Sequence, residues 1–288
     1  MELKECPICK NTKIHLLPIY ERAHLAQCNS CGFVFSILIP EQKELVAHYT
    51  HYPRGGDLSP ITIKRYNELL DKFESFRKTN KLLDYGCSNG QFLEIAAKRG
   101  WEIYGLEFAG ECFDNCARKG IKVFLLDNLP QELFREEFDI ITSFEVIEHI
   151  NNPCDKIQLI RKMLRKNGLF YFTTPNFNSL SRRFLKGKWN VIGYPEHLSY
   201  YTPKTIHQLL YNNEFRKHSL ITSGISLERF NKSMKQNDEV PNGINTDELL
   251  RQKTESKLIY AIAKKVINFL LNILSAGDSI KGFYIKIR

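Results

Sequence analysis

The 288-residue sequence contains no run of about 18 consecutive apolar residues, the length that an α-helix needs to cross a lipid bilayer. It also has no apolar stretch behind Met1 of the kind found in secretory signal peptides. We therefore expect neither a transmembrane segment nor export, and a cytoplasmic enzyme or binding protein fits this sequence best. The apolar fraction of 43% is ordinary, so one large domain with small appendages can form a full core.

Acidic residues are scarce in the last part of the chain. Residues 176–288 contain 18 Lys and Arg but 9 Asp and Glu, whereas residues 1–175 contain 23 of each kind. The whole net charge of +9 therefore lies after residue 175. Such a field favours an anionic partner, namely a phosphate, a nucleic acid or a membrane surface, and solvated lysine-rich helix faces are the alternative.

The glycine fingerprint G-x-G-x-x-G of dinucleotide-binding loops is also absent after the first predicted core strand. In its place, the apolar strand 81–85 runs into a loop bracketed by Gly86 and Gly90, which opens a helix. The glycines let the backbone approach a ligand, and the helix presents unpaired N–H groups to it. Glu107 ends the next strand, where a carboxylate can accept both hydroxyls of a ribose. The pattern predicts a nucleotide-type cofactor other than a dinucleotide.

Strand and helix patterns alternate through the rest of the chain. We predict strands at 81–85, 102–107, 121–125, 138–143, 169–174, 215–222 and 282–288. We predict helices at 60–79, 89–99, 110–119, 154–166, 203–213 and 254–274. Three of these helices would end at C-cap glycines, namely Gly100, Gly120 and Gly168. Repeated strand–helix units imply an α/β fold with a parallel sheet, whose ligands bind at the carboxyl ends of the strands.

Four of the eight cysteines have the spacing of a structural zinc ribbon. Cys6, Cys9, Cys28 and Cys31 form C-x2-C-x18-C-x2-C, in which each tight turn places two thiolates on one side. A segment as short as 1–39 cannot build its own apolar core, so zinc binding would supply its folding energy. Disulfides are the alternative, which a reducing cytoplasm disfavours. The other cysteines are expected to be inert, partly buried thiols: Cys87, Cys112, Cys116 and Cys154.

The glycine loop and three later segments together resemble a known family. Asp84–Gly90 is similar to motif I, D-x-G-x-G-x-G, of the class I S-adenosylmethionine-dependent methyltransferases, with Ser88 at the middle glycine. The resemblance continues through 138–150, 168–176 and 195–203. Behind a zinc ribbon, this set is similar to bacterial methyltransferases found with surface-glycan and sugar-modifying enzymes, and more distantly to the ubiquinone O-methyltransferases. It implies a Rossmann-like sheet of seven strands, the last antiparallel, with S-adenosylmethionine across the tips of the first two.

The resemblance also implies a division of the chain and a cofactor site. The parts would be a zinc ribbon (1–39), linker and lid helices (40–80) and a methyltransferase domain (81–288), with an acceptor loop at 176–202 and a helical insertion at 224–278. The residues expected to bind S-adenosylmethionine are Asp84, Gly86, Cys87, Ser88, Gly90, Glu107, Phe108, Asp127, Asn128, Ser143 and Glu145. Asp127 and Asn128 would meet the adenine edge, whereas Phe108 is better interpreted as a core residue.

Two sets of residues are candidates for activating the acceptor. Tyr194, Glu196 and His197 lie in the acceptor loop, where a neutral His197 would act as base and Glu196 would fix its tautomer. Sugar C-methyltransferases that share the ribbon have a similar Tyr-x-Glu-His run in the active site. A histidine that merely packs the loop is the alternative.

The second set is Glu145, Glu148 and His149, which could hold a catalytic divalent cation that lowers the pKa of an acceptor hydroxyl. Related ubiquinone methyltransferases look metal-assisted at the matching E-x-x-E-H. Helix capping by Glu148 and His149 is the alternative.

We therefore expect methyl transfer to a small-molecule acceptor, a sugar or glycan precursor, at a hydroxyl or carbon, with the acceptor anionic or phosphate-bearing. An RNA methyltransferase that uses the ribbon and the basic half is less favoured, because the ribbon is not basic and no N-P-P-[YFW]-like motif follows the fourth strand. A quinone or phenol O-methyltransferase and a non-catalytic binding module are further alternatives. The helix at 254–274 would pack on the sheet, and a contact with a membrane surface or with a partner is the alternative.

Overall fold

The computed structural model describes residues 2–41, 43–45, 48, 58–108, 110–126, 129–135, 137–226, 230, 233 and 258–288. In this part of the chain, seven strands form the main sheet in the order β10-β11-β8-β7-β4-β5-β6. The strands are β4 Lys81–Tyr85, β5 Glu102–Glu107, β6 Lys122–Leu125, β7 Phe138–Phe144, β8 Leu164–Pro175, β10 Phe215–Ser223 and β11 Ser279–Lys286. β11 runs antiparallel to both β8 and β10, whereas β4 to β8 pair in parallel. The predicted α/β sheet with an antiparallel final strand is confirmed.

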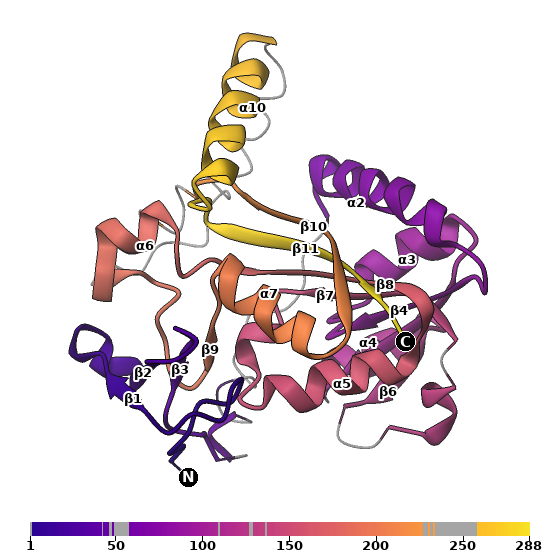
Figure 1. Cartoon of the computed structure of the whole chain (residues 1–288). Helices are drawn as coiled ribbons and strands as arrows, with labels where there is room; N and C mark the ends of the chain where they lie inside the picture. The colour runs from indigo at the N-terminus through magenta and orange to yellow at the C-terminus, as the bar shows by residue number, and fades with distance from the viewer. Residues whose placement is uncertain are drawn as a thin grey trace.

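A different group of helices covers each face of this sheet (Figure 1). Leu82 and Ile140 share an apolar cluster with α2, α3 and α4, whereas Leu83 and Ile141, one residue further along their strands, share one with α5 and α7. Successive side chains of a strand point to opposite faces, which explains the two clusters. The helices are α2 Pro60–Phe73, α3 Gln91–Lys98, α4 Glu111–Arg118, α5 Pro153–Met163 and α7 Pro203–Asn212. Both faces are thus buried, which leaves the loops at the carboxyl ends of the strands as the place for a ligand.

The predicted helix 154–166 is the clearest departure from the sequence prediction. α5 ends at Met163, and β8 begins at the next residue, so Gly168 lies within a strand rather than at a helix cap. The left-handed residue here is Asn167, with φ of 61°. A Cβ on Gly168 would come within 2.9 Å of the Phe138 carbonyl oxygen, so glycine is needed for the close approach of two strands. The predicted caps Gly100 and Gly120 do follow α3 and α4 with positive φ.

The N-terminal segment forms a second, smaller sheet that includes a strand from far along the chain. Its strands are β1 Ile14–Leu16, β2 Leu25–Cys28, β3 Val34–Ser36 and β9 Ser199–Tyr200, in that order, with the 3-10 helix η1 Pro18–Ala23 between β1 and β2. β3 pairs with β9 through Val34 opposite Tyr200 and Phe35 opposite Ser199. The predicted ribbon is therefore joined directly to the end of the predicted acceptor loop.

The predicted acceptor loop 176–202 contains regular secondary structure and a buried side chain. It contains α6 Leu180–Leu185 and η5 Lys186–Lys188, and its Trp189 is fully buried in a third apolar cluster with Tyr20 of the ribbon. The other 3-10 helices are η2 Glu74–Phe76, η3 Gln131–Phe134 and η4 Ile147–His149.

The last helix, α10 Leu258–Ile273, projects away from the rest of the molecule (Figure 1). The remainder of the insertion predicted at 224–278 lies largely outside the described residues, as does much of 42–57. Among the helices that the structure describes, none has the length and apolar character to cross a bilayer.

Candidate functional site

The loop between β4 and α3 is tightly constrained. Gly86 has φ of 80°, and a Cβ there would come within 2.5 Å of Val146; Gly90 has φ of 73°, and its Cβ would come within 2.4 Å of Ile121. Ser88 also has a positive φ, 48°, which explains why related motifs carry glycine at this position. The loop therefore presents backbone rather than side chains where α3 begins.

Glu107 lies against this loop from the end of β5. Its Oε2 accepts a hydrogen bond from the backbone N–H of Ser88 at 2.7 Å, and its Oε1 accepts one from Phe108 at 2.9 Å. Each carboxylate oxygen has a second lone pair, so the fixed and half-buried carboxylate can still accept from a pair of vicinal hydroxyls. This arrangement fits the ribose of an adenosine cofactor.

Asp84 supports the loop from the buried side. Its carboxylate is 3% exposed and accepts a hydrogen bond from the Thr142 hydroxyl at 2.7 Å. Burial raises the pKa of Asp84 to about 7, opposed by the Thr142 hydrogen bond and helped by the charge of Glu107. Cys87 is also buried, with its Sγ 3.8 Å from that of Cys116. The side chains of Asp84 and Cys87 thus belong to the packing beneath the loop.

Two more predicted cofactor residues follow at the end of β7. Ser143 is fully buried, and its hydroxyl has no hydrogen-bond partner in the described part of the chain. An unpaired buried hydroxyl is costly, so a bound ligand that reaches Ser143 would remove that cost. Glu145 has a positive φ of 53°, and its N–H donates to the Thr173 carbonyl. Asp127 and Asn128 lie outside the described residues.

The structure brings together residues from both predicted catalytic sets. Glu148, His149 and His197 place one potential ligand atom each within 4.8 Å of one another, and the two imidazole rings are 4.8 Å apart. Glu148 is buried and accepts a hydrogen bond from the Thr174 hydroxyl at 2.9 Å. We call these three residues the histidine cluster.

Backbone carbonyls fix both rings of the histidine cluster. Nδ1 of His149 is 2.8 Å from the Glu196 carbonyl oxygen, and Nδ1 of His197 is 2.6 Å from that of Val191. A carbonyl oxygen only accepts, so each Nδ1 carries a proton, and in a neutral His197 ring Nε2 is then the acceptor. His149 has a second backbone hydrogen bond, to Glu145. Burial lowers the pKa of His149 below its usual value, which keeps this ring neutral. A neutral imidazole with an acceptor Nε2 can serve as a base or as a metal ligand.

The other predicted catalytic residues have different surroundings. The Glu196 carboxylate is 3.9 Å from Nε2 of His197 and 3.8 Å from that of His48. Tyr194 donates from its hydroxyl to Glu44 at 3.3 Å, and its ring packs on His24 of the ribbon. Tyr194 thus links the acceptor loop to the N-terminal segment.

The predicted metal set changes accordingly. Glu145 is not part of the histidine cluster, and His197 takes its place beside Glu148 and His149. The proximity of His197 to Glu148 and His149, which lie in a different loop, was not predicted from the sequence. β7 and β8 are parallel neighbours, so the loops that follow them leave the sheet side by side. This adjacency of the two loops is the signal from which the histidine cluster could have been predicted.

The four predicted zinc ligands form a compact group. The sulfurs of Cys6 and Cys31 are 3.6 Å apart, those of Cys9 and Cys28 are 3.5 Å apart, and all four lie within 4.8 Å of one another. A tetrahedron with Zn–S bonds of about 2.3 Å would place its sulfurs about 3.8 Å apart, close to these values. All eight cysteines, which lie within the described residues, are free of disulfides. The donor set and spacing fit a structural zinc ion.

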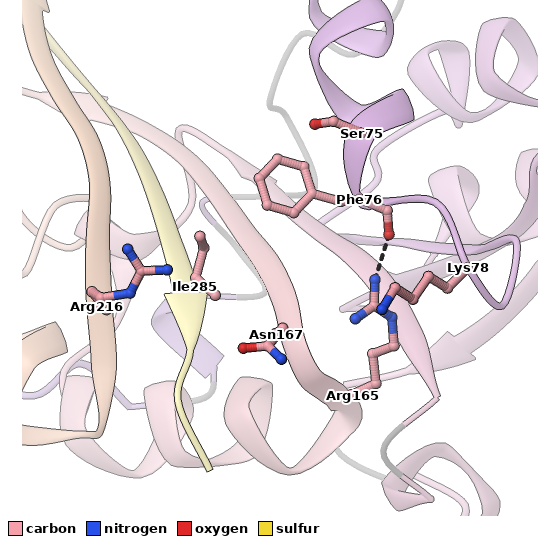
Figure 2. Close-up of a pocket in the computed structure, with 7 residues that line it drawn as sticks. All are labelled: Ser75, Phe76, Lys78, Arg165, Asn167, Arg216 and Ile285. Carbon is pink, nitrogen blue, oxygen red and sulfur yellow. Dashed lines mark hydrogen bonds between the residues drawn. The ribbon is translucent and has the colours of Figure 1, made fainter.

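A pocket of about 260 Å³ lies at the other end of the strands, where β8 and β10 begin (Figure 2). Arg165 in this pocket pairs with the buried Asp139, and it donates to the Phe76 carbonyl. Asp139 also accepts from the backbone N–H groups of Lys78 and Asn80. These bonds hold β8 against the connection into β4, so we assign this group a structural role. The pocket is lined by Ser75, Phe76, Lys78, Arg165, Asn167, Arg216 and Ile285.

Curated relatives share part of the chain. The ubiquinone biosynthesis O-methyltransferase of Photobacterium profundum is 33% identical over 111 residues, which are 36% of this chain and 47% of that protein. The protein of the same name from Actinobacillus pleuropneumoniae is 30% identical over 140 residues, 44% of this chain and 57% of that protein. The chain thus spans about half the length of the curated relatives it matches.

Solved structures share the fold. A SAM dependent methyltransferase from Archaeoglobus fulgidus matches with a TM-score of 0.52 and 17% identity, over 85% of this chain and 100% of that one. Phosphoethanolamine N-methyltransferase 2 of Haemonchus contortus, solved with S-adenosyl-L-methionine, matches with a TM-score of 0.52 and 14% identity, over 88% of this chain and 62% of that one. At these identities the likeness concerns the fold alone.

The family model described as "Methyltransferase domain" matches residues 59–220, which is more than half of the chain. This range contains the glycine loop, Glu107 and the histidine cluster. The chain therefore belongs to the methyltransferase domain family, which confirms its predicted resemblance to the class I S-adenosylmethionine-dependent methyltransferases.

Proposed function

We propose that the protein transfers a methyl group from S-adenosylmethionine to a hydroxyl or carbon of a small-molecule acceptor, with a sugar or glycan precursor as the first candidate. Support for the cofactor comes from the constrained loop Gly86–Gly90 and from the carboxylate of Glu107 held against it. When bound, S-adenosylmethionine supplies an electrophilic methyl group, so the protein's main tasks are to align the acceptor and to exclude water.

The observation that favours acceptor activation is the histidine cluster. His197 has an acceptor Nε2 because its Nδ1 donates to the Val191 carbonyl, and this nitrogen can take the proton of an acceptor hydroxyl. Glu148 beside it can stabilise the imidazolium that results. The same three side chains could instead hold a divalent cation that lowers the pKa of the hydroxyl. The excess of basic residues in 176–288 would suit an acceptor that carries phosphate.

A quinone or phenol acceptor is the second candidate. The curated relatives described above are named ubiquinone biosynthesis O-methyltransferases, and their similarity extends over 36% and 44% of the chain. A base at the histidine cluster would serve a phenolic hydroxyl as well as a sugar hydroxyl. The cytoplasmic location stays a prediction.

A panel of acceptors would test this proposal. The protein would be incubated with S-adenosylmethionine and, separately, with nucleotide sugars, sugar phosphates and catechols, and products would be followed by mass spectrometry. We expect S-adenosylhomocysteine together with a methylated nucleotide sugar or sugar phosphate. A methylated catechol alone would establish the second candidate instead. Binding of S-adenosylmethionine without turnover of any acceptor class would contradict the enzymatic proposal and favour a binding module.

A further inference from the structure

Helix α10 has the reverse of the usual amphipathic arrangement, because its polar side faces the protein. Asn268 accepts a hydrogen bond from the Gly224 N–H at 2.8 Å, and Asn272 accepts one from the Thr222 N–H at 2.9 Å. Leu271 is a buried apolar residue on this side. These contacts seat the C-terminal half of α10 on the end of β10 without using its apolar surface.

The apolar surface of α10 is exposed instead. The residues concerned have exposed fractions of 50–64%: Ile262, Val266, Ile267, Phe269, Leu270, Ile273 and Leu274. At about 100° per residue they occupy one continuous arc of about 160° around the helix. An apolar arc of this size on a protein in water marks a surface that another apolar phase covers. We call it the α10 arc.

We infer that the α10 arc docks on a lipid bilayer that carries anionic headgroups. Cations border the arc, with Lys265 next to one edge and Lys264 next to the other, and the segment 258–277 contains no acidic residue. Lysines at the edges of an apolar helix face can bury their stems and keep the ammonium groups at headgroup level. A wide apolar face with cationic borders is the pattern of a helix that lies in the interface of an anionic membrane.

Further exposed apolar and cationic residues lie in α6 and η5, near the C-terminal end of α10. α6 begins beside the end of α10, since the Leu180 N–H donates to the Ala276 carbonyl. Leu180 is 43% exposed and Phe184 is 71% exposed, while Lys186 and Lys188 in η5 are exposed cations.

A second copy of the chain suits the α10 arc less well. Two facing arcs would bring the lysines of both helices close together, and neither helix contains an acidic residue between them. The arc is also wider than the narrow seam by which two helices pack. Both features favour a lipid surface over self-association, and neither depends on the proposed methyltransferase function.

Vesicle co-sedimentation of the full chain would test the inference. The vesicles would contain equal parts of phosphatidylcholine and phosphatidylglycerol, with pure phosphatidylcholine for comparison. We expect binding to the anionic vesicles that weakens with added salt, and a loss of about tenfold or more in partitioning for Phe269→Glu. Tyr211→Glu is the matched control, because Tyr211 is an aromatic residue of α7 with 66% exposure, close to the 64% of Phe269. This control should bind as the natural protein does.

Three results would overturn the inference. The first is an absence of binding to the anionic vesicles. The second is equal binding by the Phe269→Glu and Tyr211→Glu variants. The third is a concentration-dependent dimer, detected by light scattering after gel filtration, that dissociates in Phe269→Glu and shows no vesicle binding. Circular dichroism of both variants would establish that they are folded.

Discussion

Replacing His197 by asparagine should lower the turnover number about 10²–10⁴-fold while the affinity for S-adenosylmethionine stays unchanged. An asparagine amide can still donate to the Val191 carbonyl, as Nδ1 of His197 does, so the acceptor loop should keep its position. The amide cannot take a proton at neutral pH, so the chemical step loses its base. Turnover would be measured with the best acceptor of the panel, and cofactor affinity by calorimetry.

The matched control is His207→Asn. His207 is also a half-buried histidine, but it lies on α7, with Nδ1 3.1 Å from the Tyr284 hydroxyl. This variant should keep full activity. If His197→Asn is fully active as well, His197 is not the base. A chelator that stops the natural enzyme while the four-cysteine group keeps its zinc, with recovery on addition of Mg²⁺, would assign a metal to the histidine cluster.

Loss of zinc from the N-terminal segment should have a second large effect, which reaches the histidine cluster. Structural zinc contributes about 10–16 kcal/mol in small zinc peptides, so strands β1–β3 should lose their order without it. β3 pairs with β9, the Ser36 N–H donates to the Leu198 carbonyl, and Leu198 in turn donates to the Glu148 carbonyl. We therefore expect Cys28→Ser to bind less than one zinc per chain, to unfold at a lower temperature and to lose most of its turnover.

Cys154→Ser is the control for this prediction. Cys154 is a half-buried thiol whose Sγ donates to the Pro7 carbonyl at 3.3 Å, yet it lies outside the four-cysteine group. Its variant should keep one zinc per chain by atomic absorption. A natural protein that binds no zinc, or a Cys28→Ser variant with normal turnover, would contradict the proposed role of the metal.

The positions of the core strands could be predicted from the sequence because short, largely apolar segments alternate with helical patterns along the chain. β4 and β5 begin and end where predicted, at 81–85 and 102–107. The end of α5 could not be predicted in the same way. Several residues between Leu164 and Asn167 have a high helix propensity. They nevertheless belong to β8, because Leu164 pairs with Phe138 in the sheet.

Those parts of the candidate site that lie within one short segment could be predicted from the sequence. The four-cysteine group and the glycine loop depend on spacing within a few residues, which a sequence displays directly. The histidine cluster joins residues 149 and 197, and it depends on the way a folded loop returns across the sheet. The burial of Trp189 and the pairing of β9 with the ribbon set that path, and neither has a local pattern.

The most direct measurement is a calorimetric titration of the protein with S-adenosylmethionine, together with Glu107→Ala and Glu102→Ala. Both glutamates lie on β5, but Glu102 is at the opposite end of the strand and pairs with Lys122. We expect the natural protein and Glu102→Ala to bind alike, and Glu107→Ala to bind about tenfold or more weakly, because contacts to two ribose hydroxyls are lost. No binding by the natural protein, or equal affinity in Glu107→Ala, would contradict a methyl-donor site at the glycine loop.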